Sequence, residues 1–365
     1  MATAAGSSDA AVKGLILSGG TGTRLRPITH TSAKQLVPVA NKPVLFYGIE
    51  AMAAAGIEEI GIIIAPETGA EIRAAAGDGA QFGLRIEYIE QEAPLGLAHA
   101  VLTAEPYLGD SPFVMYLGDN LLQGGIVDLV DAFREHRPDA LILLTPVSDP
   151  QNYGVAELRD GAVVRLTEKP PEPATDLALV GVYMFTSAIH DAARAISPSN
   201  RGELEITDAI QHVVDAGLRV EPHIVRGWWK DTGRLDDMLA ANRLVLDTIE
   251  GRLEGELIDS LLDGRIVVET GAVLERSTVR GPAIIGAHAH VTDAYIGPYT
   301  AVGERCVVRK AEVEHSILLA GSSVSDLNGR MESSLLGRDA SIGRSPRQPR
   351  AFRFMVGDNS EIWIL

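Results

Sequence analysis

The feature that most restricts the fold of this chain is a glycine-rich loop that directly follows a short apolar run near the N-terminus. Residues 15–17 have the composition of a buried strand, and glycines follow at positions 19, 20 and 22. Glycines let backbone N–H groups turn toward a ligand and form an anion-binding nest. Ligands of open parallel sheets bind outside the carboxyl ends of the strands. The loop therefore predicts an anionic ligand at the end of the first strand of a parallel sheet.

Three basic side chains follow this loop and strengthen the prediction. Arg24, Arg26 and Lys34 would join the backbone N–H groups in a site for a polyphosphate. The loop is not a Walker A loop, because no Gly-Lys-Ser or Gly-Lys-Thr closes it. It is not a dinucleotide fingerprint either, because no acidic residue stands at a strand end about twenty residues later. A solvated glycine-rich turn is the alternative, and the three basic residues favour phosphate.

The rest of the first two thirds of the chain predicts an α/β fold. Apolar runs at residues 60–65 and 113–117 alternate with helical patterns at 44–55 and 126–136. This alternation predicts a Rossmann-like, mostly parallel sheet with helices on both faces. Between residues 153 and 185 the pattern changes to strands separated by turn residues. We interpret that segment as an insertion that extends the sheet and carries part of a site.

The last third of the chain contains a six-residue apolar repeat. Its members are Val267, Val273, Val279, Ile285 and Val291, and the period resumes after a one-residue slip at Ile296, Val302 and Val308. Such a period predicts a left-handed parallel β-helix of hexapeptide repeats, with further coils at Val324, Leu335 and Ile342. We therefore expect a disordered tail (residues 1–12), an α/β domain (13–250) and a β-helix domain (251–365), with residues 352–365 as its cap.

Charge and cysteine content exclude some classes of function. The formal net charge of −17 argues against a general nucleic-acid-binding protein, which needs a basic face. A single cysteine, Cys306, excludes an internal disulfide bond and fits a reducing compartment. No apolar run approaches membrane-spanning length, and the start of the chain does not resemble a signal peptide. We therefore expect a cytoplasmic protein without a membrane or nucleic-acid partner.

Two aspartates distant in sequence follow predicted strands. Asp119 comes after the apolar run 113–117, and Asp231 lies in a glycine-bounded turn of the sequence WWKDTG. Each aspartate alone is more typical of a turn. Together with the phosphate loop, two carboxylates suit a Mg²⁺ ion that keeps its other positions for phosphate oxygens and water. We therefore expect Mg²⁺ as the cofactor.

The loop and its continuation resemble the signature of sugar-1-phosphate nucleotidyltransferases, which is G-x-G-x-R-L-x-P, then a lysine, then P-V-x-x-K-P. The matching residues are Gly20, Gly22, Arg24, Leu25, Pro27, Lys34, Pro38, Val39, Lys42 and Pro43. The rest of the chain, with its β-helix, is similar to the long-chain glucose-1-phosphate thymidylyltransferases of deoxysugar and antibiotic biosynthesis. The resemblance implies conversion of dTTP and α-D-glucose 1-phosphate to dTDP-glucose and pyrophosphate.

The resemblance also implies a set of site residues. Those implied for catalysis are Arg24, Lys34, Asp119, Lys169 and Asp231, of which Asp119 and Asp231 hold the metal. Those implied for the nucleotide are Leu17, Ser18, Gly19, Gly20, Thr21, Gly22, Thr23, Gln35, Gln91 and Gly96, and those for the sugar phosphate are Tyr153, Gly154, Glu168, Lys169, Val180 and Arg201. Many relatives have alanine at the position of Ser18, and the short forms have aspartate at that of Leu95.

Other functions remain open on the sequence alone. A hexapeptide acyltransferase would use a histidine such as His288 or His290 as its base. A non-catalytic regulatory homologue would keep the fold and lose the motifs, which here are intact. A third alternative is the same reaction with UTP or another nucleotide. We expect the flat faces of the β-helix to make the protein a homo-oligomer.

Overall fold

The computed structural model describes residues 11–20, 22–30 and 33–344. Most of the predicted tail, Thr21 and the predicted cap at 352–365 lie outside the described residues. By spatial contacts the chain divides into two compact units. The first, called the sheet unit, comprises residues 1–21, 32–36 and 43–232. The second, called the β-helix unit, comprises residues 22–31, 37–42 and 233–365. The predicted boundary at residue 250 stays a prediction.

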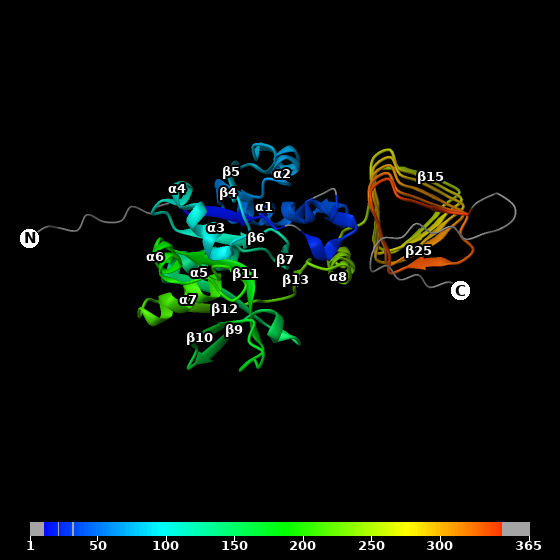
Figure 1. The fold of residues 1–365 in the computed structure, drawn as a ribbon. Coiled ribbons are helices and arrows are strands. Elements are labelled where there is room, and N and C mark those ends of the chain that lie inside the picture. Colours follow the sequence, from blue (N-terminus) through cyan, green and yellow to red (C-terminus); the bar gives the residue numbers. More distant parts are fainter. Residues whose placement is uncertain (1–10, 21, 31–32, 345–365) are drawn as a thin grey trace, which may run out of the picture. The chain divides into compact units, whose positions relative to one another are not determined.

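The sheet unit contains the predicted α/β sheet (Figure 1). Its strands are β1 (Lys13–Leu17), β4 (Glu59–Ile64), β5 (Arg85–Glu90), β6 (Phe113–Leu117), β8 (Ala140–Pro146), β9 (Gly154–Arg159), β10 (Ala162–Glu168), β11 (Leu177–Phe185) and β12 (Val220–Ile224). Strands β6, β1, β4 and β5 are parallel neighbours, and β12 is parallel to β8. Strand β11 is antiparallel to β6, β8 and β9, so the sheet is mixed. The segment predicted as an insertion, residues 153–185, forms the antiparallel hairpin β9–β10 and also β11, which lies between β9 and β6 in the sheet.

Helices cover both faces of this sheet, as the sequence predicts. The helices are α1 (Val44–Ala54), α2 (Gly69–Ala76), α3 (Leu97–Thr103), α4 (Glu105–Leu108), α5 (Val127–His136), α6 (Ala188–Ala195) and α7 (Ile206–Asp215). Because side chains alternate along a strand, Leu15 and Leu17 enter one core with α3, α6 and α7. Ile16 enters the other core, with α1, α2 and α5. A strand buried on both faces explains the continuous apolar run at 15–17.

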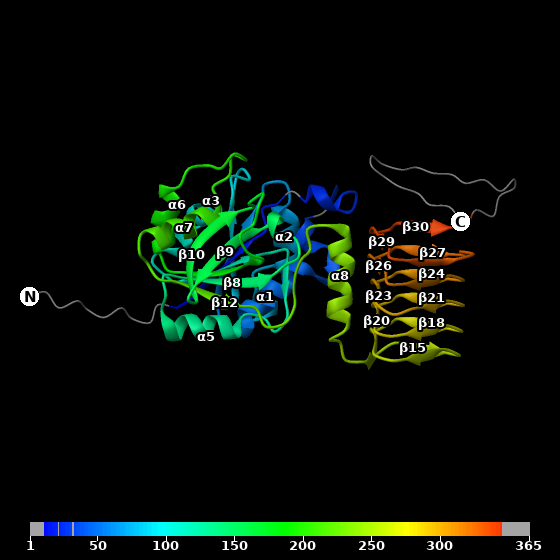
Figure 2. The same cartoon turned by 90° about the horizontal axis from the view of Figure 1, so that it is seen from below.

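The β-helix unit contains the predicted repeat structure. Within residues 252–343, short strands form three parallel sheets. The first sheet contains β14 (Arg252–Leu253), β17 (Ile266–Val268), β20 (Ala283–Ile285), β23 (Thr300–Val302), β26 (Ile317–Leu318) and β29 (Leu335–Leu336), and the second contains β15 (Glu256–Ile258), β18 (Val273–Glu275), β21 (His290–Thr292), β24 (Val307–Arg309), β27 (Ser323–Ser325) and β30 (Ser341–Gly343). The third contains β16 (Leu261–Asp263), β19 (Thr278–Arg280), β22 (Tyr295–Ile296), β25 (Glu312–Glu314) and β28 (Arg330–Glu332). Figure 2 shows the second of these sheets as a stack of strands.

The period of this β-helix differs from a strict hexad, and two predicted core positions are wrong for that reason. Val273 pairs with His290, and His290 pairs with Val307, so one coil takes 17 residues. The inward side chains at the first two positions are therefore Val268 and Leu274, one residue later than the predicted Val267 and Val273. From Val279 onward the predicted residues lie in the core, because the step from Leu274 to Val279 is five residues instead of six.

The last coils also follow the prediction in part. Val324 is fully buried inside the β-helix, as expected. Leu336, and not Leu335, belongs to the core of the next coil. Ile342 lies on β30 and is 38% exposed. In the part of the chain that the structure describes, no helix is long and apolar enough to cross a membrane.

Candidate active site

The glycine loop begins where β1 ends, between the carboxyl ends of two neighbouring strands. The Ser18 amide donates a hydrogen bond to the carbonyl of Ile63 at the end of β4 (2.8 Å). The Gly118 amide, just after β6, donates to the carbonyl of Leu17 (2.9 Å). A Cβ atom added to Gly118 would lie 2.6 Å from Ser18 Oγ, so this close approach requires glycine. The two neighbouring strands therefore fix the path of the loop.

Lys34 lies over this loop and forms an ion pair with Asp119. Its ammonium donates to Asp119 Oδ2, and both side chains are 16% exposed. A Cβ atom built on Gly20 would lie 3.0 Å from Lys34 Cε, so the lysine stem covers the loop at that glycine. Gln35 is buried beside it. The structure thus brings together Gly20, Lys34 and Asp119, which the sequence separates by up to 99 positions.

Asp231 joins this group through a short antiparallel ladder. Strand β7 (Asn120–Leu122) pairs with β13 (Trp229–Asp231), and Asp231 stands opposite Asn120. The amide and the hydroxyl of Thr232 both donate to the carbonyl of Asp119, at 3.0 and 2.8 Å. Asp119 directly precedes β7 and Asp231 ends β13, so the two predicted metal ligands lie at the same end of this ladder.

The environment of Asp119 favours its charged form. Burial by itself raises the pKa of this carboxyl group. The charge and the hydrogen bond of Lys34, together with a 3.0 Å hydrogen bond from Asn120 Nδ2, outweigh burial and hold the pKa below its usual value. Asn120 in turn accepts a 2.6 Å hydrogen bond from the indole of Trp229. The carboxylate is therefore ionised and held in a fixed orientation.

On the other side of the loop lies Gln91, the residue implied for base recognition. A Cβ atom on Gly19 would lie 3.4 Å from Gln91 Oε1. The side-chain amide Nε2 lies 3.3 Å from the carbonyl of Gly96, to which it donates, and 2.9 Å from His99 Nδ1. Sequence reasoning missed His99, which stands on the first turn of α3 without a motif of its own. These contacts hold the amide with its oxygen toward the glycine loop.

Gly96 is the tightest backbone position of the site. It has a φ of 107°, and a Cβ atom there would lie 2.6 Å from the Leu204 amide nitrogen. The Leu204 amide donates to the carbonyl of Leu95 (2.7 Å), and the Ala98 amide donates to the carbonyl of Leu204 (3.0 Å). The loop implied for the base is thus joined to the segment that carries Arg201. Only glycine fits this position without strain.

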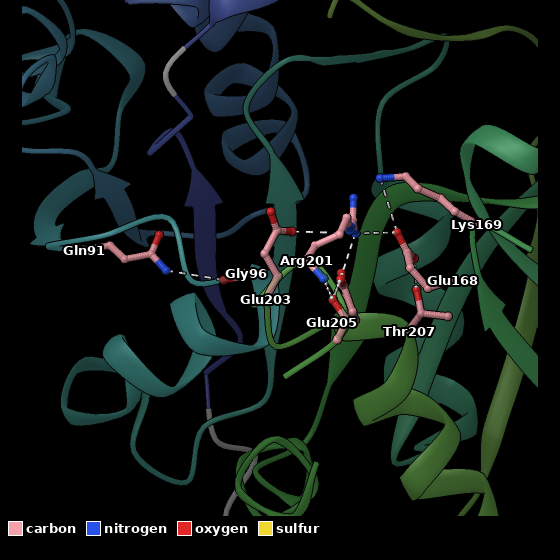
Figure 3. A network of polar contacts seen from close by, with 9 residues as sticks. Gln91, Gly96, Glu168, Lys169, Arg201, Glu203, Glu205 and Thr207 are labelled. Atoms are coloured by element: carbon pink, nitrogen blue, oxygen red, sulfur yellow. Dashed lines mark hydrogen bonds and ion pairs between the residues drawn. The ribbon is translucent and has the colours of Figure 1, made fainter. Parts of the chain in front are cut away.

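Three of the residues implied for the sugar phosphate, Glu168, Lys169 and Arg201, line one open cleft of about 790 Å³. Figure 3 shows the Arg201 side chain among Glu168, Glu203 and Glu205. Arg201 donates to Glu168 Oε1 (3.1 Å) and to Glu205 Oε1 (2.8 Å), and Lys169 Nζ lies 3.4 Å from Glu168 Oε1. Arg201 and Lys169 are 42% and 43% exposed, so both cations are accessible from solvent.

The position of Glu168 on β10 is set by residues on two other elements. The strand register places Glu168 of β10 opposite Gly154 of β9. The hydroxyl of Thr207, on the first turn of α7, donates to Glu168 Oε2 (2.7 Å). A Cβ atom on Gly154 would lie 2.7 Å from that hydroxyl oxygen. Sequence reasoning missed Thr207, although it belongs to the segment RGELEITD that carries Arg201.

Tyr153 and Val180 complete the residues implied for the sugar. The ring of Tyr153 packs edge-on against Trp229, with 5.5 Å between the ring centroids, so it lies beside the strand of Asp231. Val180 is fully buried on β11, where the register with β8 shifts. Its side chain belongs to the core, so only its backbone can contact a ligand.

The other residues weighed in the sequence belong to the β-helix unit or lie outside the described residues. Arg24 is exposed on the short 3₁₀ helix Thr23–Leu25, which belongs with Gly22 to the β-helix unit. Thr21 lies outside the described residues. His290, weighed as an acyltransferase base, is exposed on the outside of β21. The roles of these residues stay predictions.

Comparison with known proteins shows what this chain is similar to. A family model described as nucleotidyl transferase matches residues 13–248. The glucose-1-phosphate thymidylyltransferase of Streptomyces antibioticus is 57% identical over 97% of this chain and 99% of the relative. The enzyme of the same name from Streptomyces griseus is 55% identical over the same shares. The low-salt glycan biosynthesis nucleotidyltransferase Agl11 of Haloferax volcanii is 47% identical over 96% and 99%.

Solved structures agree with this comparison. A Bacillus anthracis protein, provisionally named glucose-1-phosphate thymidylyltransferase, superposes with a TM-score of 0.62 and 34% identity over 66% of this chain and 98% of its own. A UDP-glucose pyrophosphorylase has a TM-score of 0.59 at 23% identity over 66% of this chain and 100% of its own, a likeness that concerns the fold alone. By its family model and its full-length relatives, this chain belongs to the nucleotidyl transferase family.

Proposed function

We propose that this chain converts dTTP and α-D-glucose 1-phosphate to dTDP-glucose and pyrophosphate. The observation that carries the proposal is the 57% identity to a glucose-1-phosphate thymidylyltransferase over 97% of this chain. That match extends over the β-helix as well as the sheet unit. The grouping of Gly20, Lys34 and the two aspartates at one end of the sheet supports a reaction on a polyphosphate.

The triphosphate would lie along the glycine loop. Backbone N–H groups at Gly19 and Gly20 would donate to its oxygens, and Arg24 would neutralise the departing pyrophosphate. Lys34 lies next to Gly20, where it would meet the nucleotide phosphates. On the other side of the loop, the oxygen of Gln91 would accept a hydrogen bond from the N–H of a pyrimidine base.

The aspartates at the ladder β7–β13 fit a Mg²⁺ ion. Two carboxylates, with no third acidic, histidine or cysteine ligand grouped beside them among the described residues, leave positions for phosphate oxygens and water. Such an ion would supply positive charge to the reacting phosphate. Asp119 is suited to hold it because its pKa is low and its carboxylate is oriented by Asn120.

The sugar phosphate would bind in the cleft beside Arg201. Its phosphate would form ion pairs with Arg201 and Lys169. These would replace the present ion pairs of the two cations with the carboxylates of Glu168 and Glu205. Glu168, fixed by Thr207, would accept hydrogen bonds from sugar hydroxyls. The exchange of carboxylate for phosphate around Arg201 predicts that binding of glucose 1-phosphate weakens as salt concentration rises.

The chemistry then requires positioning and charge neutralisation. An oxygen of the sugar phosphate forms a bond to the α-phosphorus, and the bond from that phosphorus to the bridging oxygen breaks, which releases pyrophosphate. The attacking oxygen is already an anion, so no general base is needed. Lys34, Arg24, Lys169 and Arg201 hold the two anions together against their repulsion.

A panel of nucleotides tests this function. Pyrophosphate release from the purified full-length protein is measured with glucose 1-phosphate, Mg²⁺ and either dTTP, UTP or the other nucleoside triphosphates. We expect the highest kcat/KM with dTTP. A higher value with UTP would assign the same reaction to another nucleotide. No release with any nucleotide would indicate the regulatory homologue.

A further inference from the structure

The segment after Lys34 forms a small hairpin that is too short to be stable by itself. Strands β2 (Pro38–Val39) and β3 (Lys42–Pro43) are joined by Ala40 and Asn41, with φ values of 48° and 62°. Two-residue strands are too short for independent stability, and alanine disfavours a left-handed backbone. Contacts from elsewhere must therefore hold this turn. The hairpin is the P-V-x-x-K-P part of the nucleotidyltransferase signature.

Those contacts come from the β-helix unit, to which the hairpin belongs. Helix α8 (Leu235–Leu246) presents Asn242, which is fully buried. The Ala40 amide donates to Asn242 Oδ1 (2.9 Å), and Asn242 Nδ2 donates to the carbonyl of Tyr299 just before β23 (3.0 Å). Asn242 thereby joins the hairpin, the helix and a β-helix coil with one side chain. Its acceptor and its donor are both used, as expected for a buried amide.

A second hydrogen bond and an apolar cluster reinforce this attachment. Asn41 Nδ2 donates to the carbonyl of Val302 in β23 (2.8 Å). Ala40 packs with Ile249 and Tyr299 against the buried side chains of Leu246, Val267 and Ile284. The guanidinium of Arg243 lies 4.8 Å from the Tyr299 ring centroid. This cluster also explains why Val267, which points away from the coil interior, is buried.

We propose that the β-helix serves as a scaffold for the nucleotide-binding signature, with Asn242 as its positioning residue. The hairpin directly follows the 3₁₀ helix of Lys34 (Lys34–Leu36) and directly precedes α1, so its geometry sets the course of the chain on both sides. Arg24 belongs to the same unit as the hairpin. This role rests on the proposed function, because it acts on binding of the nucleotide.

The full-length variant Asn242→Ala tests the role of this amide. We expect its kcat/KM for dTTP to fall about tenfold or more, because small misplacements of binding groups are costly. The KM for glucose 1-phosphate should stay within about twofold of wild type, since its cleft lies on other elements. Amide hydrogen exchange at Ala40 and Asn41 should become faster. Asn328→Ala, at an exposed β-helix loop, is the matched control and should change none of these values.

Asn41→Gly keeps the proposal testable if Asn242→Ala does not fold. Glycine adopts the left-handed backbone of position 41 and lacks only the hydrogen bond to Val302. The expected result is again a selective loss of kcat/KM for dTTP. Faster hairpin exchange with wild-type kinetics in both variants, or an equal loss for both substrates, would overturn the positioning role. The proposed function is tested separately by the turnover of the wild type in the same assay. The role of Asn242 is tested only by the ratio of kcat/KM for dTTP between variant and wild type.

Discussion

At the scale of single residues, the active-site region is organised around opposite charges that hold one another before any substrate arrives. Lys34 is paired with Asp119, and Arg201 with Glu168 and Glu205. Each cation is half-buried or accessible, so a phosphate can displace its carboxylate partner. The paired carboxylates keep the cations in place and limit the cost of their desolvation. With the proposed function, the free protein would thus be preorganised for two anionic substrates.

The two aspartates give the first prediction. Asp119→Asn and Asp231→Asn should each lower kcat on the order of a hundredfold or more, because a group that stabilises developing charge is lost. Asp119→Asn also removes the partner of Lys34. The measurement is initial-rate pyrophosphate release at saturating dTTP and glucose 1-phosphate. Glu135→Gln, an exposed carboxylate on α5, serves as the control. Turnover within twofold of wild type in both aspartate variants would remove the metal assignment.

A buried histidine away from the site predicts a pH dependence of stability. His190 on α6 is 3% exposed and stacks on Phe113, with ring centroids 6.0 Å apart. Burial is the largest influence on the pKa of His190 and lowers it. The nearby carboxylates of Glu105 and Asp191 raise this pKa, and the guanidinium of Arg194 lowers it further. Below about pH 6.5 the unfolded chain takes up a proton that the folded protein resists. Stability is therefore complete above that pH and is lost as pH falls toward the lowered pKa of the folded protein.

His190→Leu should remove this loss. The free energy of unfolding of each protein is measured by urea titration between pH 7.5 and 5.5. Below pH 6.5 it should fall less for the variant than for wild type, and the two slopes should differ by up to about 1.4 kcal/mol per pH unit. His212→Gln, at an exposed position of α7, provides the comparison and should follow the wild type. Parallel pH profiles of wild type and His190→Leu would show that His190 does not resist protonation.

At the scale of elements, the strands and helices of the sheet unit were predictable because each has a strong pattern. Strand β6 begins and ends at the predicted residues 113 and 117, and α1 begins at the predicted residue 44. Strand β4 covers Glu59–Ile64 where residues 60–65 were predicted, and α5 begins at Val127, one residue after the predicted start. These ends are set by turns and by packing, to which the periodicity of apolar residues is insensitive.

The coil register was harder to predict. Neighbouring valines such as Val267 and Val268 fit a hexad equally well, and only packing decides between them. Val268 fills the coil interior, and Val267 packs against Leu246, the last residue of α8. A period of six therefore identifies a β-helix but leaves the inward residue ambiguous by one position wherever two apolar residues are adjacent.

The coil register predicts which substitutions destabilise the β-helix. Ile285 is fully buried in the coil interior, whereas Ile258 on β15 is 39% exposed. Ile285→Ala should reduce the free energy of unfolding by about 2–5 kcal/mol through lost burial and a cavity. Ile258→Ala should cost much less. Urea unfolding followed by far-ultraviolet circular dichroism measures both, and equal effects would contradict the register.

At the scale of the whole molecule, the sequence indicated some of the side chains that lie together in the structure, but not the contacts that hold them. The signature indicated Lys34, and the ends of two predicted strands indicated Asp119 and Asp231. The structure places these three residues at one loop and one ladder, and their roles stay predictions. No pattern indicated that Asn242 would bind the hairpin of the same signature, or that Thr207 would hold Glu168. Such contacts join residues distant in sequence, and a single chain carries no periodicity that records them.

The end of the β-helix supports the expectation of a homo-oligomer. The first coil, formed by β14, β15 and β16, has no strand on one side within the described residues, and Leu253 and Leu261 on it are 53% and 62% exposed. Open strand edges with exposed apolar side chains favour association. Light scattering after size-exclusion chromatography at micromolar concentration should give a multiple of the single-chain mass. A single-chain mass would exclude the oligomer.

The most direct test of the central claim is a crystal structure of the protein with dTTP and Mn²⁺ in place of Mg²⁺. We predict electron density for the triphosphate along residues 19–23. We also predict an anomalous peak for the metal within coordination distance of both Asp119 and Asp231. A fully occupied nucleotide bound elsewhere, or a glycine loop that stays empty at saturating dTTP, would contradict the account.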